Sequence, residues 1–308
     1  MEPSISSSSS ATHFLIYGIV IYLSSTIISG GNETDHEALL QIRSLVTLDP
    51  YGALSTWNNS LHFCDWDHVY CGKRHRRVTY IELESNGVEG SLSPYVGNLS
   101  FLRRLSLVSR WNPTFLGESY INGSIPHTLG HLKSLKEVLL GSCNLSYING
   151  TIPRSIGSLV GLETLILGGN QFVGNIPSTI GNLQKQKIIQ LGENQLSGQI
   201  PDAMGNLSSL ISLDLSSNML EGVIPSSLGN CRNMLALYLY DNKLSGKIPT
   251  QLLQVSSLSI ILDLSKNKLF GSLPTEVGDL NMLTIMDLYQ IITYKVLFLL
   301  ALVIVVAF

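Results

Sequence analysis

Apolar residues recur along most of this chain at two alternating spacings, three residues apart and then two residues apart. The segments 162–183, 210–231 and 234–255 align to one template, LxxLxLxxNxLxGxIPxxLGxL. Asparagines of this template lie 24 residues apart, and the last follows after 25: Asn170, Asn194, Asn218, Asn242 and Asn267. A fixed period of this length indicates a repeat architecture in which each repeat is one structural unit.

The LxL part of the template predicts a short strand in every repeat. Successive side chains of a strand point to opposite faces, so the two leucines lie inside and the residues beside them lie on an open face. One repeat cannot bury its apolar side alone, and neighbouring repeats must therefore stack. We expect an α/β repeat solenoid, a right-handed superhelix of leucine-rich repeats, over residues 78–288, with eight complete repeats and a ninth begun at Leu283.

The other template positions have structural roles. Each asparagine follows a strand, where its amide can bond to backbone groups of adjacent turns that would otherwise be buried without a partner. Glycine permits a bend and proline restricts the backbone on the outer side. The residues are Gly174, Gly198, Gly222, Gly246, Gly271, Pro177, Pro201, Pro225, Pro249 and Pro274. Cys143 and Cys231 lie at interior positions of separate repeats, and we expect free, buried thiols.

The beginning of the chain is typical of a secreted protein. Residues 14–28 are largely apolar and small residues follow, so we expect residues 1–31 to be a signal peptide, with an uncleaved N-terminal anchor as the alternative. Seven glycosylation acceptor motifs agree with export. They are at Asn32, Asn58, Asn98, Asn122, Asn144, Asn149 and Asn206. We therefore place the chain in the secretory pathway, at the cell surface or outside the cell.

Residues 32–77 are predicted to cap the first apolar edge of the solenoid. An amphipathic helix is expected to end at Asp49-Pro50, and a second short segment ends at Trp57. The basic run KRHRR at 73–77 is expected to be a solvated loop that leads into the first strand.

Cys64 and Cys71 lie seven residues apart in this cap, with His68 and His75 interleaved. This spacing is compatible with zinc. In an exported chain, however, a structural disulfide is the commoner use of two cysteines. We therefore expect a disulfide and no metal.

Several of these residues carry a family resemblance. Cys64, Trp66, Val69 and Cys71 match C-x-W-x-x-V-x-C, and LxGxIP recurs in the repeats. On these motifs, residues 34–288 resemble the extracellular region of plant leucine-rich-repeat receptor-like kinases. The segments HFCDWDHVYCGKRHRRV and LSPYVGNLSFLRRLSL are similar in sequence to the immune receptor subfamily whose members recognise bacterial components. The resemblance implies the disulfide and a recognition role, although the chain carries none of the kinase signatures.

Composition narrows the function further. Hydrophobic residues make up 44% of the chain and charged residues 13%, which excludes disorder, and a net charge of -3 gives no global field favouring nucleic acid. Asp214, Asp263 and Asp287 occupy middle strand positions at separations of about 5 and 10 Å, which overlap glycosidase geometry. Because an open face does not exclude water, we predict no enzymatic activity and no cofactor.

A ligand is expected to bind on the concave sheet of repeats six to nine, where two tyrosines are candidate anchors. The predicted binding residues are Asp214, Ser216, Tyr238, Tyr240, Asp241, Asp263, Ser265, Lys266 and Asp287. A smoother apolar strip in repeats three and four is the alternative surface. It consists of Leu139, Gly141, Ile166 and Gly168.

These features predict a non-catalytic, receptor-like recognition module for plant defence or development, which binds a peptide, a glycan or a co-receptor with a similar ectodomain. Polygalacturonase-inhibiting proteins share the LxGxIP repeat, so an inhibitor of foreign cell-wall hydrolases is one alternative. A truncated, non-functional receptor fragment is another, because the repeat pattern fails at Ile291.

The chain closes with an apolar tail at 289–308. A helix from Ile291 to Phe308 would be about 27 Å long, close to the roughly 30 Å hydrocarbon core of a membrane. We therefore expect a marginal membrane anchor, with an aggregation-prone tail and packing over the open end of the solenoid as alternatives.

Overall fold

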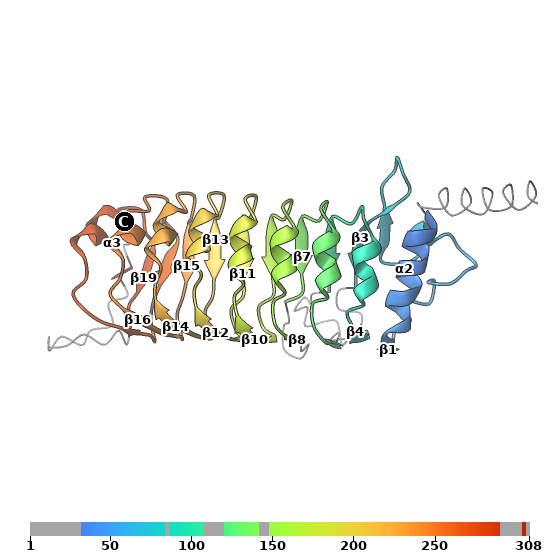
Figure 1. Cartoon of the computed structure of the whole chain (residues 1–308), viewed down its shortest axis with the longest axis horizontal. Helices are drawn as coiled ribbons and strands as arrows, with labels where there is room; N and C mark the ends of the chain where they lie inside the picture. Colours follow the sequence, from blue (N-terminus) through green and yellow to red (C-terminus); the bar gives the residue numbers. More distant parts are fainter. Residues whose placement is uncertain (1–31, 84–86, 108–119, 142–147, 290–303, 306–308) are drawn as a thin grey trace, which may run out of the picture.

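The computed structural model describes residues 32–83, 87–107, 120–141, 148–289 and 304–305. Its repeats stack into an elongated, gently curved solenoid, which confirms the predicted fold class (Figure 1). Each repeat in the described residues adds one parallel strand to a long sheet. These strands are β3 (Val78–Glu82), β5 (Arg104–Ser106), β7 (Glu137–Leu139), β9 (Thr164–Ile166), β11 (Ile188–Gln190), β13 (Ser212–Asp214), β15 (Ala236–Tyr238), β17 (Ile261–Asp263) and β19 (Ile285–Asp287).

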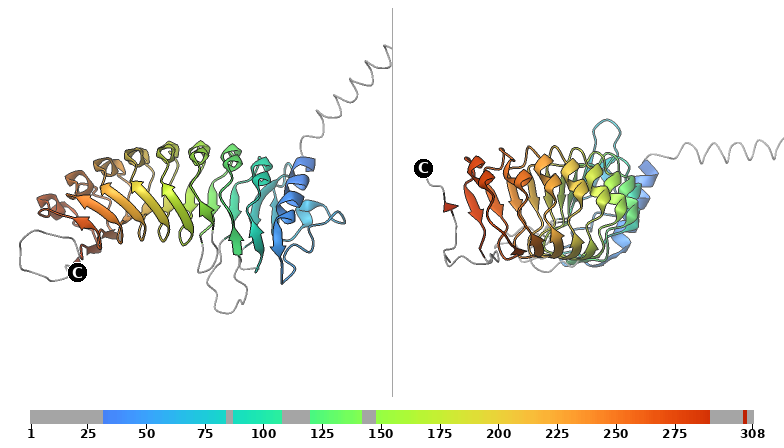
Figure 2. Two further views of the ribbon diagram at one scale, coloured as in Figure 1. Left: turned by 60° about the horizontal axis from the view of Figure 1, so that its bottom comes forward. Right: turned by 60° about the vertical axis from the view of Figure 1, so that its left-hand side comes forward.

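Short 3-10 helices lie on the opposite side of each repeat, along the convex side of the curve (Figure 2). They are η2 (Pro94–Asn98), η3 (His127–His131), η4 (Arg154–Ser158), η5 (Ser178–Asn182), η6 (Asp202–Asn206), η7 (Ser226–Asn230) and η8 (Thr275–Asp279), with a short α-helix, α3 (Thr250–Leu253), in the same place. The template prolines stand immediately before these helices, as at Pro201 with φ -64°. Their restricted φ angle suits the entry to a helical turn.

A second parallel sheet runs along the side of the solenoid and was not predicted. It consists of β8 (Asn149–Gly150), β10 (Gln171–Asn175), β12 (Gln195–Gln199), β14 (Met219–Val223), β16 (Lys243–Gly246) and β18 (Lys268–Leu269). From the sequence, the template glycine in or just after these strands predicted a bend and no strand. All five of the predicted bend glycines have positive φ, between 72° and 98°. A glycine can bend the chain and still lie in or beside a strand of this sheet, because the strand pairs with strands of the neighbouring repeats.

The template asparagines connect each repeat to its neighbours. The side chain of Asn218 donates to the carbonyl groups of Leu191, Leu215 and Ser216 at 2.9–3.2 Å, and its Oδ1 accepts from the Leu196 N–H at 2.9 Å. The same arrangement recurs at Asn194 and Asn242. These backbone groups are buried, so the asparagine supplies partners that water cannot.

The cap begins with α2 (Asn32–Ser44), which ends before the predicted stop at Asp49. A strand that was not predicted, β1 (Val46–Leu48), follows and pairs antiparallel with β4 (Glu89–Ser91), which in turn pairs with β6 (Tyr120–Asn122). This pairing depends on Gly90, because a Cβ there would lie 2.4 Å from the Leu45 carbonyl oxygen. Helix α2 therefore ends at Ser44, ahead of a strand that pairs with β4, about 45 residues further along the chain.

The predicted disulfide joins Cys64, which lies in η1 (Phe63–Asp65), to Cys71, which ends β2 (Val69–Cys71). β2 pairs antiparallel with β3 and so extends the long sheet into the cap. Trp57 and Trp66 stack with ring centroids 5.5 Å apart, and both are buried. The cap therefore has its own aromatic core against the first repeat.

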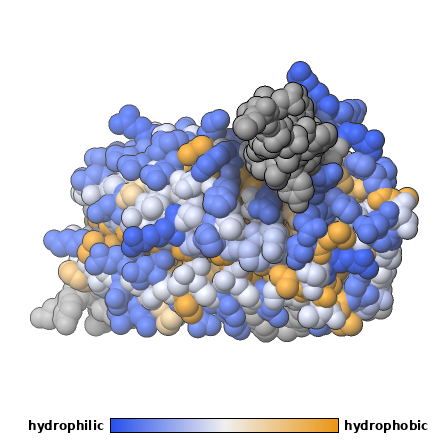
Figure 3. Space-filling view, turned by 45° about the vertical axis from the view of Figure 1, so that its right-hand side comes forward, coloured by the Kyte–Doolittle hydropathy of each residue, from blue (hydrophilic) through white to orange (hydrophobic). Residues whose placement is uncertain are grey.

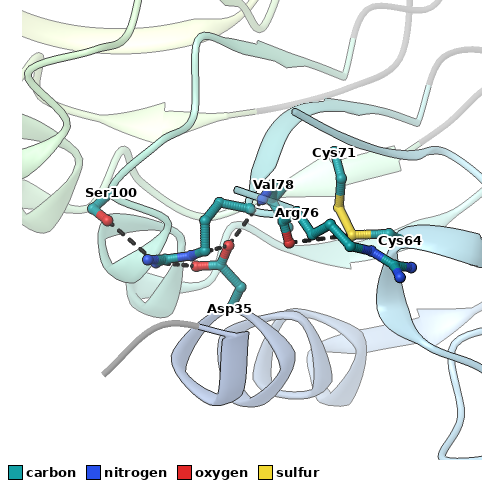
Figure 4. Close-up of polar contacts among 7 residues, drawn as sticks. Asp35, Cys64, Cys71, Arg76, Val78 and Ser100 are labelled. Atoms are coloured by element: carbon teal, nitrogen blue, oxygen red, sulfur yellow. Dashed lines mark hydrogen bonds and ion pairs between the residues drawn. A yellow bond between two sulfur atoms is a disulfide. The ribbon is translucent and has the colours of Figure 1, made fainter. Parts of the chain in front are cut away.

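A buried ion pair joins the cap helix to the first repeat. Arg77 donates to the Asp35 carboxylate at 2.7 and 2.9 Å, and the Val78 N–H donates to the same carboxylate at 2.8 Å (Figure 4). Arg77 also reaches the Ser100 hydroxyl at 3.3 Å. The expectation of a solvated loop over 73–77 is therefore wrong for Arg77, which is only 9% exposed, and it holds for the four residues before it.

Several predictions fall on segments outside the described residues. These are the signal peptide, Cys143 and nearly all of the apolar tail. Within the tail, β20 (Ile304–Val305) pairs antiparallel with β19. Among the described residues, no helix has the length and apolar character needed to cross a membrane. Cys231 is a free, buried thiol as predicted, and burial raises its pKa to about 11.

The asparagine contacts give a test of stability. Asn218→Ala would leave several buried backbone groups without partners, so we expect a loss of at least about 2 kcal/mol in the free energy of unfolding. Guanidinium titration followed by circular dichroism measures this loss. Asn182→Ala, at an exposed asparagine that ends η5, is the matched control. Equal midpoints for the two variants would contradict the role of Asn218.

The ion pair in the cap gives a second test. Asp35→Ala would leave the buried Arg77 guanidinium without its counter-charge, so we expect a loss of about 3–5 kcal/mol. Adding Arg77→Met should recover much of that loss, because no uncompensated charge then remains. Thermal unfolding of both forms measures the effect, with the exposed Glu33→Ala as control. If the double variant is no more stable than Asp35→Ala, the pair does not act as described.

Candidate binding face

The outward positions of the long sheet form rows that run from repeat to repeat. In the middle row, Tyr238 lies directly between Asp214 and Asp263, and Asp287 follows Asp263. Tyr240 lies two residues after Tyr238, just past the end of β15, and is also half-buried. We call these five residues the tyrosine patch. The structure thus brings together five of the nine predicted binding residues.

The carboxylates of the tyrosine patch are held in place by their own repeats. Asp214 Oδ1 accepts from the Ser216 N–H at 2.9 Å and from the Ser216 hydroxyl at 2.5 Å. Asp263 and Ser265 repeat this contact at 3.0 and 2.6 Å. Two predicted binding residues are therefore misplaced: Ser216 and Ser265 are buried, so they orient a carboxylate rather than face a ligand.

A glycine in the neighbouring repeat makes room for the first of these contacts. A Cβ on Gly192 would lie 2.8 Å from both Asp214 Oδ1 and the Ser216 hydroxyl oxygen. The Asp214 carboxylate therefore lies against the backbone of the preceding repeat. Among the described residues, no hydrogen bond to the other oxygen, Asp214 Oδ2, is present, so this oxygen can accept one from a ligand.

Tyr238 is half-buried, and its pKa is raised by burial first and then by the negative charges of Asp214 and Asp263. Its hydroxyl stays protonated at neutral pH and can donate a hydrogen bond. Asp241 and Lys266 are exposed with positive φ, at 57° and 51°. They lie in the turns after the strands, and so border the tyrosine patch at its rim.

One residue of this surface was missed. Tyr289 is 44% exposed, its N–H donates to Asp287 Oδ1 at 2.8 Å, and its carbonyl accepts from the Lys266 N–H at 2.8 Å. It occupies the same template position as Tyr240, two residues after the middle strand position. The repeat register was therefore the signal that could have identified it.

The alternative apolar strip offers less surface. Leu139 and Gly141 are buried, whereas Ile166 and Gly168 are half-buried. Two of the four residues are thus closed to a ligand. The strip is a weaker candidate than the tyrosine patch.

Charged residues of the first repeats pair with one another on the concave sheet. Arg104 lies 3.2 Å from Glu82 and 3.1 Å from Glu137. Glu163 lies between Lys187 at 2.8 Å and Lys136 at 3.2 Å, and bonds to these lysines lower its pKa. These ions are largely neutralised before any ligand arrives.

The predicted glycosylation sites that the structure describes lie away from the concave sheet. Asn98 and Asn206 end 3-10 helices on the convex side, and Asn122 and Asn149 lie in the lateral strands; all four are exposed. Asn58 is half-buried and its side chain bonds to Ser55 and Ser60 in the cap. Asn144 and the Asn32 side chain lie outside the described residues. Glycosylation stays a prediction, but glycans at these sites would leave the sheet open.

Comparison with known proteins finds leucine-rich-repeat domains in the chain and relatives among plant receptor kinases. Residues 32–72 match the leucine rich repeat N-terminal domain, and residues 160–220 match the leucine rich repeat. The receptor-like protein kinase At3g47110 of Arabidopsis thaliana is 43% identical over 94 residues, which cover 30% of this chain and 8% of that protein.

Solved ectodomains of such receptors have the same fold. The ectodomain of GASSHO1/SCHENGEN3 from Arabidopsis thaliana, in complex with CASPARIAN STRIP INTEGRITY FACTOR 2, has a TM-score of 0.78 at 32% identity, covering 84% of this chain and 30% of that one. The Arabidopsis receptor kinase HAESA, in complex with the peptide hormone IDA and the co-receptor SERK1, has a TM-score of 0.69 at 30% identity, covering 84% and 41%.

The chain carries a leucine-rich-repeat N-terminal domain followed by leucine-rich repeats, and its relatives are plant leucine-rich-repeat receptor kinases. It spans less than half the length of each of these three relatives. The matched region in the solved structures is the ectodomain.

The environment of Tyr238 gives a titration test. Asp214→Asn with Asp263→Asn should lower the pKa of Tyr238, because two charges that oppose tyrosinate are removed. Ultraviolet absorbance, compared with a Tyr238→Phe form of each protein, measures the change. Asp241→Asn, at the rim, is the control, and an unchanged pKa in the double variant would contradict this arrangement. In the unmodified protein, the raised pKa means that protonated Tyr238 contributes to the stability of the fold. This contribution is complete below pH 10.0, the ordinary pKa of tyrosine, and is lost as the pH rises through the raised pKa.

Proposed function

We propose that this chain is a receptor-like, extracellular recognition module that binds a peptide on the tyrosine patch. The observation that carries this proposal is the pair of half-buried tyrosines among oriented carboxylates on an open parallel sheet. Tyrosine contributes large contact area and one hydrogen bond at low entropic cost, and it is enriched at binding hot spots.

The chemistry of the tyrosine patch favours recognition over catalysis. The inner oxygens of Asp214 and Asp263 are occupied by serine donors. Their carboxylates stand two strands apart, about 10 Å, with Tyr238 between them. They can accept hydrogen bonds or pair with cationic groups of a ligand. An open sheet also lets a bound peptide remain partly exposed to a second protein, and the third component in this proposal is a co-receptor with a similar ectodomain.

Location outside the cell is supported by the disulfide, which persists in oxidising compartments, and by exposed acceptor asparagines on the convex and lateral sides. The solved complexes of GASSHO1/SCHENGEN3 and HAESA with their peptide or protein ligands are consistent with this role. The aromatic rings and carboxylates of the tyrosine patch would complement a peptide that has an aromatic or apolar side chain beside a cationic one.

Selection from a random peptide library tests the proposal. Peptides selected on the purified protein should lose at least about tenfold in affinity when Tyr238→Ala is combined with Tyr240→Ala. Tyr95→Ala, at an exposed tyrosine in η2 on the convex side, is the matched control and should have no effect. Peptides that bind the double variant as tightly as the parent protein would place the site elsewhere.

A further inference from the structure

A hollow of about 520 Å³ lies where the β2–β3 hairpin meets the first two repeats. The hairpin turn projects beyond the end of the sheet (Figure 1). Cationic side chains line the hollow from two directions: Lys73 and Arg74 from the hairpin, with His75 beside them, and Arg103 from the strand region of repeat two. Tyr80 and Phe101 complete the wall, with 37% and 40% of their surface exposed. Of the residues that the structure describes, no acidic one lines it.

The cations of this hollow differ from the other charges of the sheet. Arg77, which also lines the hollow, is neutralised by Asp35, and its guanidinium carbon lies 4.8 Å from the centre of the Phe101 ring. Among the described residues, Lys73, Arg74 and Arg103 take part in no ion pair. By contrast, Arg104, next to Arg103, contacts two carboxylates.

Uncompensated like charges around one concavity attract an anion, because the low-dielectric walls focus their field. The volume lies within the range of ligand pockets, and is large enough for one or two side chains. Arginine favours carboxylates and other planar or tetrahedral oxyanions, which it can hold with two parallel hydrogen bonds. The hollow is therefore suited to an anionic group with some apolar surface that can lie against Tyr80 and Phe101.

The position of the hollow indicates what kind of molecule carries that anion. Arg103 and Thr79, both in its lining, are joined by a backbone hydrogen bond of 2.8 Å, and Tyr80 lies opposite Arg104 in the long sheet. The hollow thus opens at the N-terminal end of the same sheet that bears the tyrosine patch. Among the described residues, the charges without an ion-pair partner are basic at this end of the sheet and acidic at the other, at Asp214, Asp263 and Asp287.

A ligand that complements both ends must carry anionic groups at one end and cationic groups at the other. A peptide can do so, whereas an acidic glycan or a free phosphate cannot. Six strand spacings separate β3 from β15, or about 29 Å, which an extended peptide spans in about nine residues.

We propose that the hollow binds acidic side chains of a peptide whose cationic and aromatic end reaches the tyrosine patch. This inference rests on the proposed function for the second half of the ligand only. Binding of the acidic end to the hollow stands on the hairpin, Arg103 and the two aromatic walls.

Two synthetic probes separate the two halves. The first is hexaglutamate, which tests the hollow alone. The second joins three glutamates to three lysines through a flexible spacer of about 28 glycine and serine residues, whose root-mean-square length of about 29 Å matches the separation. Both should bind the parent protein by calorimetry at low salt, and the two-ended probe should bind at least about tenfold more tightly than a version without the spacer.

The key variant reverses two charges of the hairpin, Lys73→Glu with Arg74→Glu, and leaves Arg77 in place because it supports the fold. It should weaken hexaglutamate binding at least about tenfold. The matched control reverses two exposed lysines of the lateral sheet, Lys243→Glu with Lys268→Glu, and should change affinity far less. Equal losses in the two variants would mean that only net charge matters, and would overturn the proposal.

Other outcomes distinguish this inference from the proposed function. If hexaglutamate binds normally to the Tyr238→Ala and Tyr240→Ala protein but library peptides do not depend on those tyrosines, the hollow stands and the tyrosine patch fails. If library peptides need the tyrosines but the hairpin variant binds hexaglutamate like the parent, the hollow fails alone. Tighter binding of an oligogalacturonate of equal charge than of hexaglutamate would also overturn the assignment to a peptide.

Discussion

The structure depends on the satisfaction of buried backbone groups between repeats by one asparagine side chain per repeat. A repeat of about 24 residues leaves carbonyl and N–H groups inside the solenoid after each strand, where water cannot reach them. Asn194, Asn218 and Asn242 each bond to their own turn, to the carbonyl of the preceding repeat and to an N–H in the lateral sheet. Because the same bonds recur, every strand enters the sheet in the same register.

This constant register determines how the outward side chains are arranged. Side chains at one template position form a row across the sheet, so that residues 24 or 25 positions apart in sequence become neighbours in space. Asp214, Tyr238 and Asp263 meet in this way, and their contacts come from adjacent strands rather than from a folded loop. A solenoid can therefore vary its outward residues without altering the interior, and the binding face is open to change while the asparagines are not.

Charge is treated differently in three parts of the molecule. In the cap, Asp35 and Arg77 are buried together, which holds the helix α2 against the first repeat. Along the first repeats, exposed charges such as Glu163 and Lys187 neutralise one another. In the tyrosine patch, by contrast, serine side chains orient the carboxylates. Near the hairpin, basic side chains cluster without ion-pair partners among the described residues. Figure 3 shows that the surface on this side is mixed and mainly polar. Ionic contacts with a ligand cost less in these last regions, since paired ions must first be separated.

The sequence by itself determined the repeat, the inward leucines, the role of the asparagines and the positive φ of glycines such as Gly198, because each follows from a local period and the conformational limits of single residues. It also indicated Cys64–Cys71 and the row that contains Tyr238. Only the tertiary structure decided the lateral sheet, the end of α2, and the burial of Arg77 and Ser216, because each depends on a neighbour from another part of the chain. Arg77 is part of a basic run and looks solvated until Asp35, 42 residues earlier, is placed beside it. The contact between Asp35 and Arg77 lies outside the repeat and carries no periodic signal, and for that reason the pattern of the chain could not reveal it.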